Sequence, residues 1–399
     1  MTGDRGSGPE ETLARAAWSR LVEPGDTVAG ALVQTLGARQ ALDWVRWAAT
    51  DGRADAAVEG LVTRDDPSLA PLRRRLGSAL ARWEPRLAGV DPQRDLEHVH
   101  RLGGRFLHPG APGWPAGLDD LGAAAPLGLW QRGEPDADRL LARSVALVGA
   151  RASTAYGERV AVDLSEALAG RGVCVVSGGA YGIDAAAHRG ALAGGGATVA
   201  LLAGGVDRAY PAGNAALLER VLERGGAVLS EVPPGGVPSR SRFLQRNRLI
   251  AAVSRATVVV EAAWRSGALS TAHHAADLLR PLGAVPGPVT SVASAGCHRL
   301  LREGAAVCVT DAAEVLELVG PLAAAPDERH EDTRPHDGLD RVADRVLDAL
   351  SLRSAADVDT LARRAGLSPA EVRGGLGSLE LAGLAELRAT GWRRTQPVT

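Results

Sequence analysis

The sequence predicts an α/β protein whose core is a doubly wound, mostly parallel sheet. Five short apolar runs lie between residues 143 and 320, and each is followed by a Gly- or Ser-bearing turn and a helical stretch. The runs are continuous rather than alternating, which is typical of strands buried on both faces. Strands that alternate with helices predict a Rossmann-like core over 143–320. The apolar runs cover residues 145–148, 173–176, 198–202, 227–229 and 257–260.

The segments before this core predict two further parts. Residues 1–95 are rich in Ala, Leu and Arg at helical spacing, as in the run from Leu13 to Trp18, and predict an N-terminal helical domain. Residues 96–142 carry several Pro and Gly residues. Such residues forbid long helices, so we expect an extended lead-in there.

The segments after the core predict a linker and a small domain. Residues 321–340 are polar, acidic-leaning and contain Pro, which is typical of a linker. Residues 341–399 show three short helical stretches, and the last begins with a capping box at Ser368-Pro369-Ala370-Glu371. The following segment, bounded by Gly383 and Gly391, is typical of a β-wing. Together these features predict a winged-helix domain.

Composition narrows the classes of function. The net charge is −2, so any nucleic-acid site must come from a local patch. All 45 basic residues are Arg, because the chain has no Lys. The sequence therefore excludes a Walker A phosphate loop and Schiff-base catalysis. Every Arg carries a permanently charged, planar group that suits phosphate.

Cysteine spacing and hydropathy predict the compartment. Cys174, Cys297 and Cys308 show no paired spacing, so we expect neither a disulfide framework nor a metal site. The N-terminus is polar, and no apolar run reaches the length of a membrane span. We expect a soluble, cytoplasmic protein that has no cofactor and does not bind a membrane.

A Gly-rich turn follows the second predicted strand. It reads Ser177-Gly178-Gly179-Ala180-Tyr181-Gly182-Ile183-Asp184, a near miss for the dinucleotide fingerprint because Ser177 replaces the first Gly. A hydride-transfer enzyme is therefore not expected. Such turns bring backbone N–H groups and a helix N-terminus up to an anion. The alternative is a tight turn without a ligand.

Loops after the other strands carry further unusual residues. Gly149-Ala150-Arg151 follows the first predicted strand, and Gly204-Gly205 follows the third. Glu261 and Ser266-Gly267-Ala268 follow the strand at 257–260. Sheets of this kind bind ligands outside the carboxyl ends of their strands, so we expect all of these loops to line one crevice.

Aromatic and basic residues gather in the same region. The three Tyr residues, Tyr156, Tyr181 and Tyr210, lie in or beside these loops, where they could stack unpaired bases or merely pack the loops. The segment from Arg240 to Arg248 has four Arg residues, one Phe and no acidic residue. We expect it to bind phosphate, with a solvated charged face as the alternative.

The sequence gives little indication of a catalytic site. His188 lies four residues after Asp184, which places both on one helix face. We expect a structural hydrogen bond between them rather than a catalytic pair. No nucleophile has elbow spacing and no carboxylate pair is recognisable, so no catalytic residue is predicted.

In combination, these motifs resemble the DNA-processing protein A (DprA/Smf) family. The turn from Ser177 to Asp184, with His188, is similar to the family signature, and Gly149-Ala150-Arg151 is similar to its Gly-Ser/Ala-Arg turn. The resemblance is close over 143–310 and looser elsewhere. Further motifs follow in the family's order, namely Tyr210-Pro211 with Asn214, Ser230-Glu231, Phe243 with Arg246-Asn247-Arg248, Glu261 with Ser266-Gly267, and Pro286-Gly287.

The resemblance implies a non-enzymatic protein. It implies that the chain binds and protects incoming single-stranded DNA, forms a homodimer and loads the RecA recombinase during natural transformation or recombination. The crevice and the resemblance together assign DNA contacts to Gly149, Arg151, Ser177, Gly178, Gly179, Tyr181, Gly205, Tyr210, Phe243, Arg246, Asn247, Arg248, Ser266 and Gly267.

Three positions depart from the family pattern. Ala212 stands where the family often has a Lys that contacts DNA, Leu244 replaces a usual Pro, and His298 stands where Asn is common. Losing one phosphate contact would reduce the slope of log K against log salt concentration by about one.

Two other functions compete with this interpretation. Related Rossmann-like folds hydrolyse nucleoside monophosphates, as phosphoribohydrolases, through a Gly-rich loop followed by Glu. Here Glu261 precedes Ser266-Gly267, so the order is wrong. A duplex-DNA regulator would read DNA through the winged helix, whose last helix offers only Arg373 among acidic residues.

Overall fold

The structure is a computed structural model that describes residues 8–50, 70–134, 136–320, 341–351, 354–388 and 390–395. The chain divides into two compact units, Met1–Leu322 and Ala323–Thr399. The predicted linker, residues 321–340, lies outside the described residues.

Within the described residues, nine strands form one sheet in the order β1-β2-β6-β5-β4-β3-β7-β8-β9. The five predicted strands are all present and pair in parallel from β6 through β7. The prediction of a doubly wound, mostly parallel core is confirmed. These strands are β3 (Ser144–Gly149), β4 (Cys174–Ser177), β5 (Thr198–Leu202), β6 (Ala227–Ser230) and β7 (Ala256–Glu261).

Four strands that the sequence patterns did not indicate complete this sheet. At one edge, β1 (Arg105–Leu107) and β2 (Leu129–Gly133) pair antiparallel, so the Pro-containing lead-in contributes to the sheet. At the other edge, β8 (Leu282–Ala284) and β9 (Val307–Cys308) pair parallel. Strands of two or three residues are too short to show a hydrophobic period, and β2 contains Gln and Arg.

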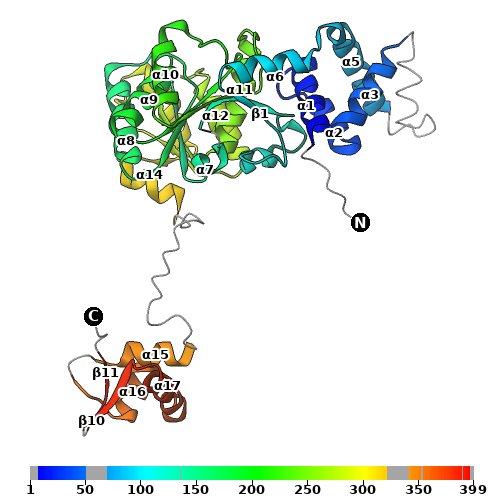
Figure 1. The fold of residues 1–399 in the computed structure, drawn as a ribbon. Coiled ribbons are helices and arrows are strands. Elements are labelled where there is room, and N and C mark those ends of the chain that lie inside the picture. Colours follow the sequence, from blue (N-terminus) through cyan, green and yellow to red (C-terminus); the bar gives the residue numbers. More distant parts are fainter. Residues whose placement is uncertain are drawn as a thin grey trace. The chain divides into compact units, whose positions relative to one another are not determined.

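Helices cover both faces of the sheet (Figure 1). On β3, Val145 and Leu147 belong to the apolar cluster with α8, α9 and α14, whereas Ala146 and Val148 belong to the cluster with α11 and α12. Both faces of this strand are therefore buried, which explains its continuous apolar run. These helices are α8 (Ala155–Ala169), α9 (Ile183–Ala193), α14 (Ala312–Val319), α11 (Arg240–Val253) and α12 (Ala268–Asp277). The other α-helices within residues 136–320 are α7 (Ala137–Leu141), α10 (Ala215–Glu223) and α13 (Ala295–Arg302).

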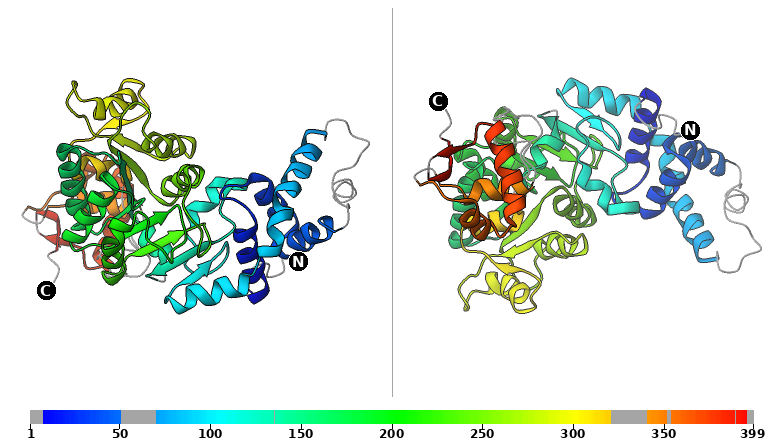
Figure 2. Two further views of the ribbon diagram at one scale, coloured as in Figure 1. Left: turned by 90° about the horizontal axis from the view of Figure 1, so that it is seen from above. Right: turned by 90° about the horizontal axis from the view of Figure 1, so that it is seen from below.

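The N-terminal region is helical, as its spacing predicts, and lies beyond one end of the sheet (Figure 2). Its core contains Trp18 and Trp83, whose rings meet edge to face with centroids 5.5 Å apart. This edge-to-face geometry suits the aromatic quadrupoles. The helical segments are α1 (Pro9–Leu21), α2 (Thr27–Leu36), α3 (Ala38–Ala48), α5 (Ala70–Trp83), the 3₁₀ helix η2 (Glu84–Gly89) and α6 (Pro92–Arg101).

The second unit is a winged helix, as predicted. The side chain of Ser368 accepts a hydrogen bond from the N–H of Glu371, and the Glu371 carboxylate accepts one from the Ser368 N–H, which forms the predicted capping box. Three helices pack around one apolar core. The elements are α15 (Arg341–Ala349), α16 (Val358–Ala365), α17 (Pro369–Leu381), β10 (Ala385–Arg388) and β11 (Gly391–Arg394).

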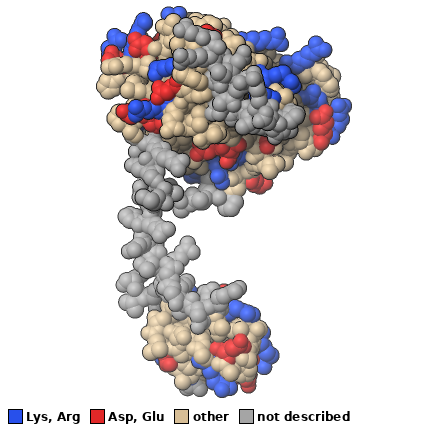
Figure 3. Space-filling view, turned by 90° about the vertical axis from the view of Figure 1, so that its right-hand side faces the viewer, with Lys and Arg blue, Asp and Glu red and all other residues tan. Residues whose placement is uncertain are grey.

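The face over the N-terminal helices carries both signs of charge. Figure 3 shows Arg and acidic side chains interspersed there. Exposed ion pairs on the N-terminal helices include Arg46–Asp43, whose charged atoms lie 3.7 Å apart. Exposed pairs of this kind contribute little stability. Because the signs alternate over the described part of this face, the face does not favour a polyanion.

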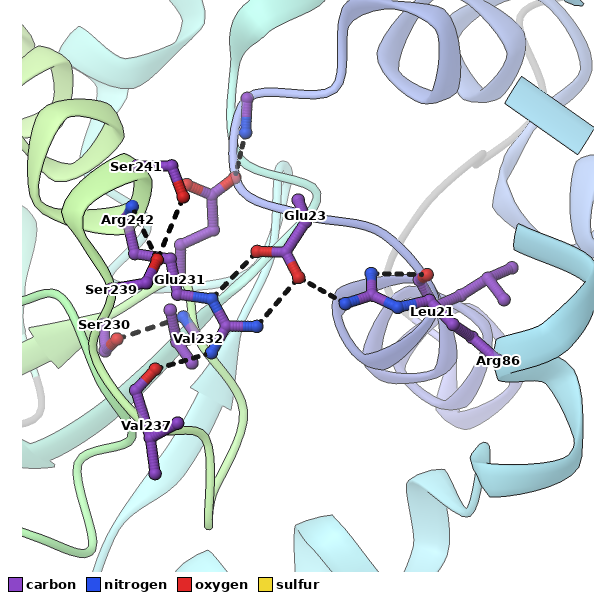
Figure 4. Close-up of polar contacts among 11 residues, drawn as sticks. Leu21, Glu23, Arg86, Ser230, Glu231, Val232, Val237, Ser239, Ser241 and Arg242 are labelled. Carbon is purple, nitrogen blue, oxygen red and sulfur yellow. Dashed lines mark hydrogen bonds and ion pairs between the residues drawn. The ribbon is translucent and has the colours of Figure 1, made fainter. Parts of the chain in front are cut away.

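Glu23 links the N-terminal helices to α11 (Figure 4). Its carboxylate accepts hydrogen bonds from Nε and Nη2 of Arg242, at 2.8 and 2.9 Å, and another from Arg86. Burial alone would raise the pKa of Glu23, but the hydrogen bonds from Arg242 and Arg86 hold that pKa below its ordinary value. Arg242 lies in the first turn of α11, so this link fixes the start of the helix.

A buried ion pair fixes the same helix further along. Nη1 and Nη2 of Arg248 each donate to a Glu231 oxygen at 2.8 Å, and Nε of Arg248 donates to the carbonyl of Ala124 at 2.9 Å. The Arg248 side chain is 3% exposed and that of Glu231 is 11% exposed. The N–H of Gly25 donates to the same carboxylate at 3.3 Å, which adds a second contact with the N-terminal helices.

This ion pair makes Arg248 a stabilising residue. We expect Arg248→Met to lower the free energy of unfolding of the first unit by about 3–5 kcal/mol, because Glu231 would keep a buried, unpaired charge. Urea unfolding followed by circular dichroism measures the change. Arg240→Met, at an exposed position of the same helix, is the matched control and should change stability by less than about 0.5 kcal/mol. Equal midpoints for the two variants would contradict this role.

Candidate nucleic-acid interface

The strand order of the sheet reverses at β3. From β3 the chain adds β4, β5 and β6 on one side, and β7 then pairs with the other side of β3. The connections that leave β3 and β7 therefore pass to opposite faces, and a crevice opens at the carboxyl ends of these two strands. A cavity of about 780 Å³ occupies this place, which we call the main cavity.

Glu261, at the end of β7, shapes one wall of the main cavity without lining it. Its buried carboxylate accepts hydrogen bonds from the backbone N–H and the hydroxyl of Thr154, at 2.8 and 2.7 Å. Its carbonyl accepts the N–H of Ala150 at 2.7 Å. A Cβ on Gly157 would lie 2.5 Å from the carboxylate, so any larger residue there would displace Glu261. Glu261 thus fixes the turn that presents Arg151.

Phe243 is the centre of an aromatic and cationic cluster. The guanidinium of Arg151 lies 4.0 Å from the centre of the Phe243 ring, within cation–π range. The ring of Tyr210 lies 5.9 Å away at an angle of 53°. Phe243 is half-buried, whereas Arg151 and Tyr210 are exposed. The cluster therefore offers a permanent positive charge beside two aromatic faces.

Arg246 and Asn247 form the floor of the main cavity. Nη1 of Arg246 donates to the carbonyls of Gly178 and Leu201, at 2.6 and 2.5 Å. Burial lowers the pKa of Arg246 to about 10, so this side chain stays charged at neutral pH. Nδ2 of Asn247 donates to the carbonyl of Gly267 at 3.1 Å, which holds the turn after β7.

The structure brings most of the predicted site residues together. Residues from the turn after β3, the turn after β7 and α11 face one another across the main cavity. Those that line it are Gly149, Arg151, Tyr210, Phe243, Arg246, Asn247, Ser266 and Gly267.

Six predicted site residues do not line the main cavity. Three of them, Ser177, Gly178 and Gly179, lie behind its floor, and the Ser177 hydroxyl donates to the carbonyl of Leu147 at 2.7 Å. Gly205 packs against the segment at 233–236. Tyr181 is 52% exposed and lies beside Gly213, and Arg248 is buried in its ion pair with Glu231.

Sequence reasoning missed several residues that line the main cavity. Arg265 directly precedes the Ser266-Gly267 turn, and its place after a strand could have indicated it. Arg240 was noted only as part of a charged segment, although it lies at the start of α11 and lines the main cavity. Asp184 lines it too, although its side chain is buried; burial raises the pKa of Asp184, and Arg246 offsets part of the rise.

The predicted hydrogen bond between Asp184 and His188 is wrong. Nδ1 of His188 pairs with the Thr198 hydroxyl at 2.8 Å, and Asp184 instead accepts the N–H of Ala180 at 3.4 Å. Both side chains lie on one face of α9, but His188 packs against β5, where the buried Thr198 hydroxyl pairs with its ring. Burial lowers the pKa of His188 to about 4, so its ring is neutral.

The described residues lack two kinds of feature. Among them, no group of three or more His, Cys, Asp or Glu side chains is arranged to hold a metal ion. No helix in the described ranges has the length and apolar character that a membrane span requires.

Comparison with known proteins identifies relatives of both units. A family model described as DNA recombination-mediator protein A matches residues 105–320, and one described as DprA winged helix domain matches residues 330–389. A putative DNA processing protein DprA from Mycobacterium tuberculosis (strain ATCC 25618 / H37Rv) is 45% identical over 391 residues, covering 94% of this chain and 93% of the relative.

More distant relatives agree with this match. Protein Smf from Escherichia coli (strain K12) is 40% identical over 250 residues, covering 60% of this chain and 64% of the relative. An X-ray structure of DNA processing protein A from Streptococcus pneumoniae is 26% identical, with a TM-score of 0.58, and covers 78% of this chain and 98% of that one. The chain therefore belongs to the DNA recombination-mediator protein A family, whose relatives named here are DprA and Smf proteins.

Proposed function

We propose that this protein binds and protects single-stranded DNA in the main cavity without catalysing a reaction. It then loads a RecA recombinase onto the strand during natural transformation or recombination, and it acts as a cytoplasmic homodimer. The observation that carries the binding proposal is the cluster of Arg151, Phe243 and Tyr210 at the mouth of the main cavity. The family's description as a recombination mediator supports the transfer of the strand to a recombinase.

The chemistry of the main cavity favours an unpaired strand. Three exposed Arg residues line it, namely Arg151, Arg240 and Arg265, and each can contact a phosphate. Phe243 and Tyr210 can stack only on bases whose faces are free. In a duplex each base is already stacked on its neighbours, so a duplex would gain only the phosphate contacts.

We expect sequence-tolerant binding of single-stranded DNA in preference to duplex of the same length. Three phosphate contacts predict a slope of roughly −2 when log K is plotted against log salt, at about 0.7 per contact for single strands. Fluorescence anisotropy with labelled oligonucleotides at several salt concentrations measures both quantities. Equal affinity for the two forms, or release of free base from nucleoside monophosphates, would instead favour a different function.

Arg151 should contribute strongly to this binding. Arg151→Ala removes one charge-assisted contact worth about 1.5–3 kcal/mol, so affinity should fall roughly tenfold to hundredfold at fixed salt. Arg151→Lys should recover part of the loss, because it keeps the charge but not the planar fork. Arg171→Ala is the matched control, since Arg171 is exposed just before the amino end of β4, whereas the main cavity lies at the carboxyl ends of the strands. Wild-type affinity in Arg151→Ala would place the site elsewhere.

The winged helix should be dispensable for binding the strand. A chain that ends at Gly320 keeps every residue that lines the main cavity and nearly the whole of the first compact unit. We expect its affinity for single-stranded DNA to stay within about threefold of the full chain, a difference below 1 kcal/mol. The same anisotropy titration checks this, and loss of most of the affinity would mean that the second unit holds part of the site.

A further inference from the structure

Trp264 is exposed although its side chain is large and apolar. It lies in the turn after β7 and is 53% exposed. Trp18, Trp83, Trp114 and Trp130 are buried, and Trp47, on α3, is 45% exposed. Trp side chains at contact surfaces present an apolar face that stacks or packs well, so the position of Trp264 suggests a binding role.

Trp264 lies in a hollow of its own. Beside the main cavity is a second hollow of about 360 Å³, which we call the Trp264 hollow. The guanidinium of Arg299, from α13, lies 5.2 Å from the centre of the Trp264 ring. All eight lining residues are neutral or basic, and they are Trp264, Arg265, Ser266, Leu269, Ser270, His273, His274 and Arg299.

The Trp264 hollow adjoins the main cavity. Arg265 and Ser266 line both, and Arg265 is exposed. A strand whose phosphate contacts Arg265 can therefore reach both hollows. The same pairing of a cation with an aromatic ring occurs in each, as Arg151 with Phe243 and as Arg299 with Trp264.

We propose that the Trp264 hollow is a second subsite for single-stranded DNA, in which an unpaired base stacks on the indole and a neighbouring phosphate contacts Arg265 or Arg299. This inference rests on the proposed function and lengthens its footprint. Glu303 pairs with Arg299 at 3.8 Å, but Arg265 and Arg299 still give the hollow a positive lining, and this charge favours a polyanion. Sequence-tolerant stacking on an aromatic face is the usual way in which proteins hold unpaired bases.

The test compares a short and a long oligonucleotide. Trp264→Ala should weaken binding of an oligothymidylate of about 16 nucleotides roughly tenfold, because one stacked base is lost. It should leave binding of one of about 4 nucleotides within roughly twofold, because a short strand is held in the main cavity. Trp264→Phe should retain most of the affinity for the long strand. Trp47→Ala, which removes a Trp that is 45% exposed on α3, should change neither.

Other outcomes would overturn the inference. Unchanged affinity of Trp264→Ala for the long strand means that the hollow is not a subsite. An equal loss for both lengths means that Trp264 acts on the main cavity itself. A changed mass by light scattering with unchanged DNA affinity would mean that a second copy of the chain occupies the hollow. Failure of the proposed function is distinguishable, because the wild-type protein would then bind neither oligonucleotide.

Discussion

A buried arginine holds the walls of the main cavity together. Arg246 extends from α11 beneath the main cavity. Its Nη1 donates to the carbonyl of Gly178, in the turn after β4, and to the carbonyl of Leu201, in β5. A guanidinium away from water is costly unless its hydrogen bonds are made, so these bonds constrain three elements at once. Asp184 lies nearby and favours the charged form of Arg246. Because Arg246 also lines the main cavity, the geometry of the site depends on it.

The helix that carries Arg246 is itself braced from outside. Glu23 holds Arg242 in its first turn, and Glu231 holds Arg248 six residues further along the helix. Both contacts involve the N-terminal helices, the second through Gly25. This gives the N-terminal helices an architectural role that their sequence does not indicate. They position α11, and through it the aromatic cluster around Phe243.

The sequence predicts the positions of the main strands and helices better than it predicts individual side-chain contacts. The strands β3 to β7 are buried on both faces, so their apolar runs are unmistakable, and the capping box marks the start of α17. The turns after β3 and β7 were correctly assigned to one crevice, because parallel strands direct their carboxyl ends to the same edge. The short strands β8 and β9 carry no such pattern, and β2 contains polar residues.

The Arg-rich segment shows where sequence reasoning stops. Its four Arg residues appear equivalent in the sequence, yet they point in different directions from one helix. Arg240 borders the main cavity, Arg242 and Arg248 form ion pairs, and Arg246 lies in the floor. Which side chain meets which partner depends on how α11 is rotated against the sheet, and that is set by contacts with residues 17 to 219 positions away in the sequence. The same limit explains His188, whose partner comes from β5.

The contact between Gly178 and Arg246 also bears on how this site can change over evolutionary time. A Cβ on Gly178 would lie 2.0 Å from Nη1 of Arg246, so no side chain fits while the arginine is in place. Replacing the arginine first would remove a donor from two carbonyls, and replacing the glycine first would displace the guanidinium. Neither single step is tolerated well, so the two positions can change readily only together. Across relatives of this chain, these two residues should therefore be kept or lost as a pair.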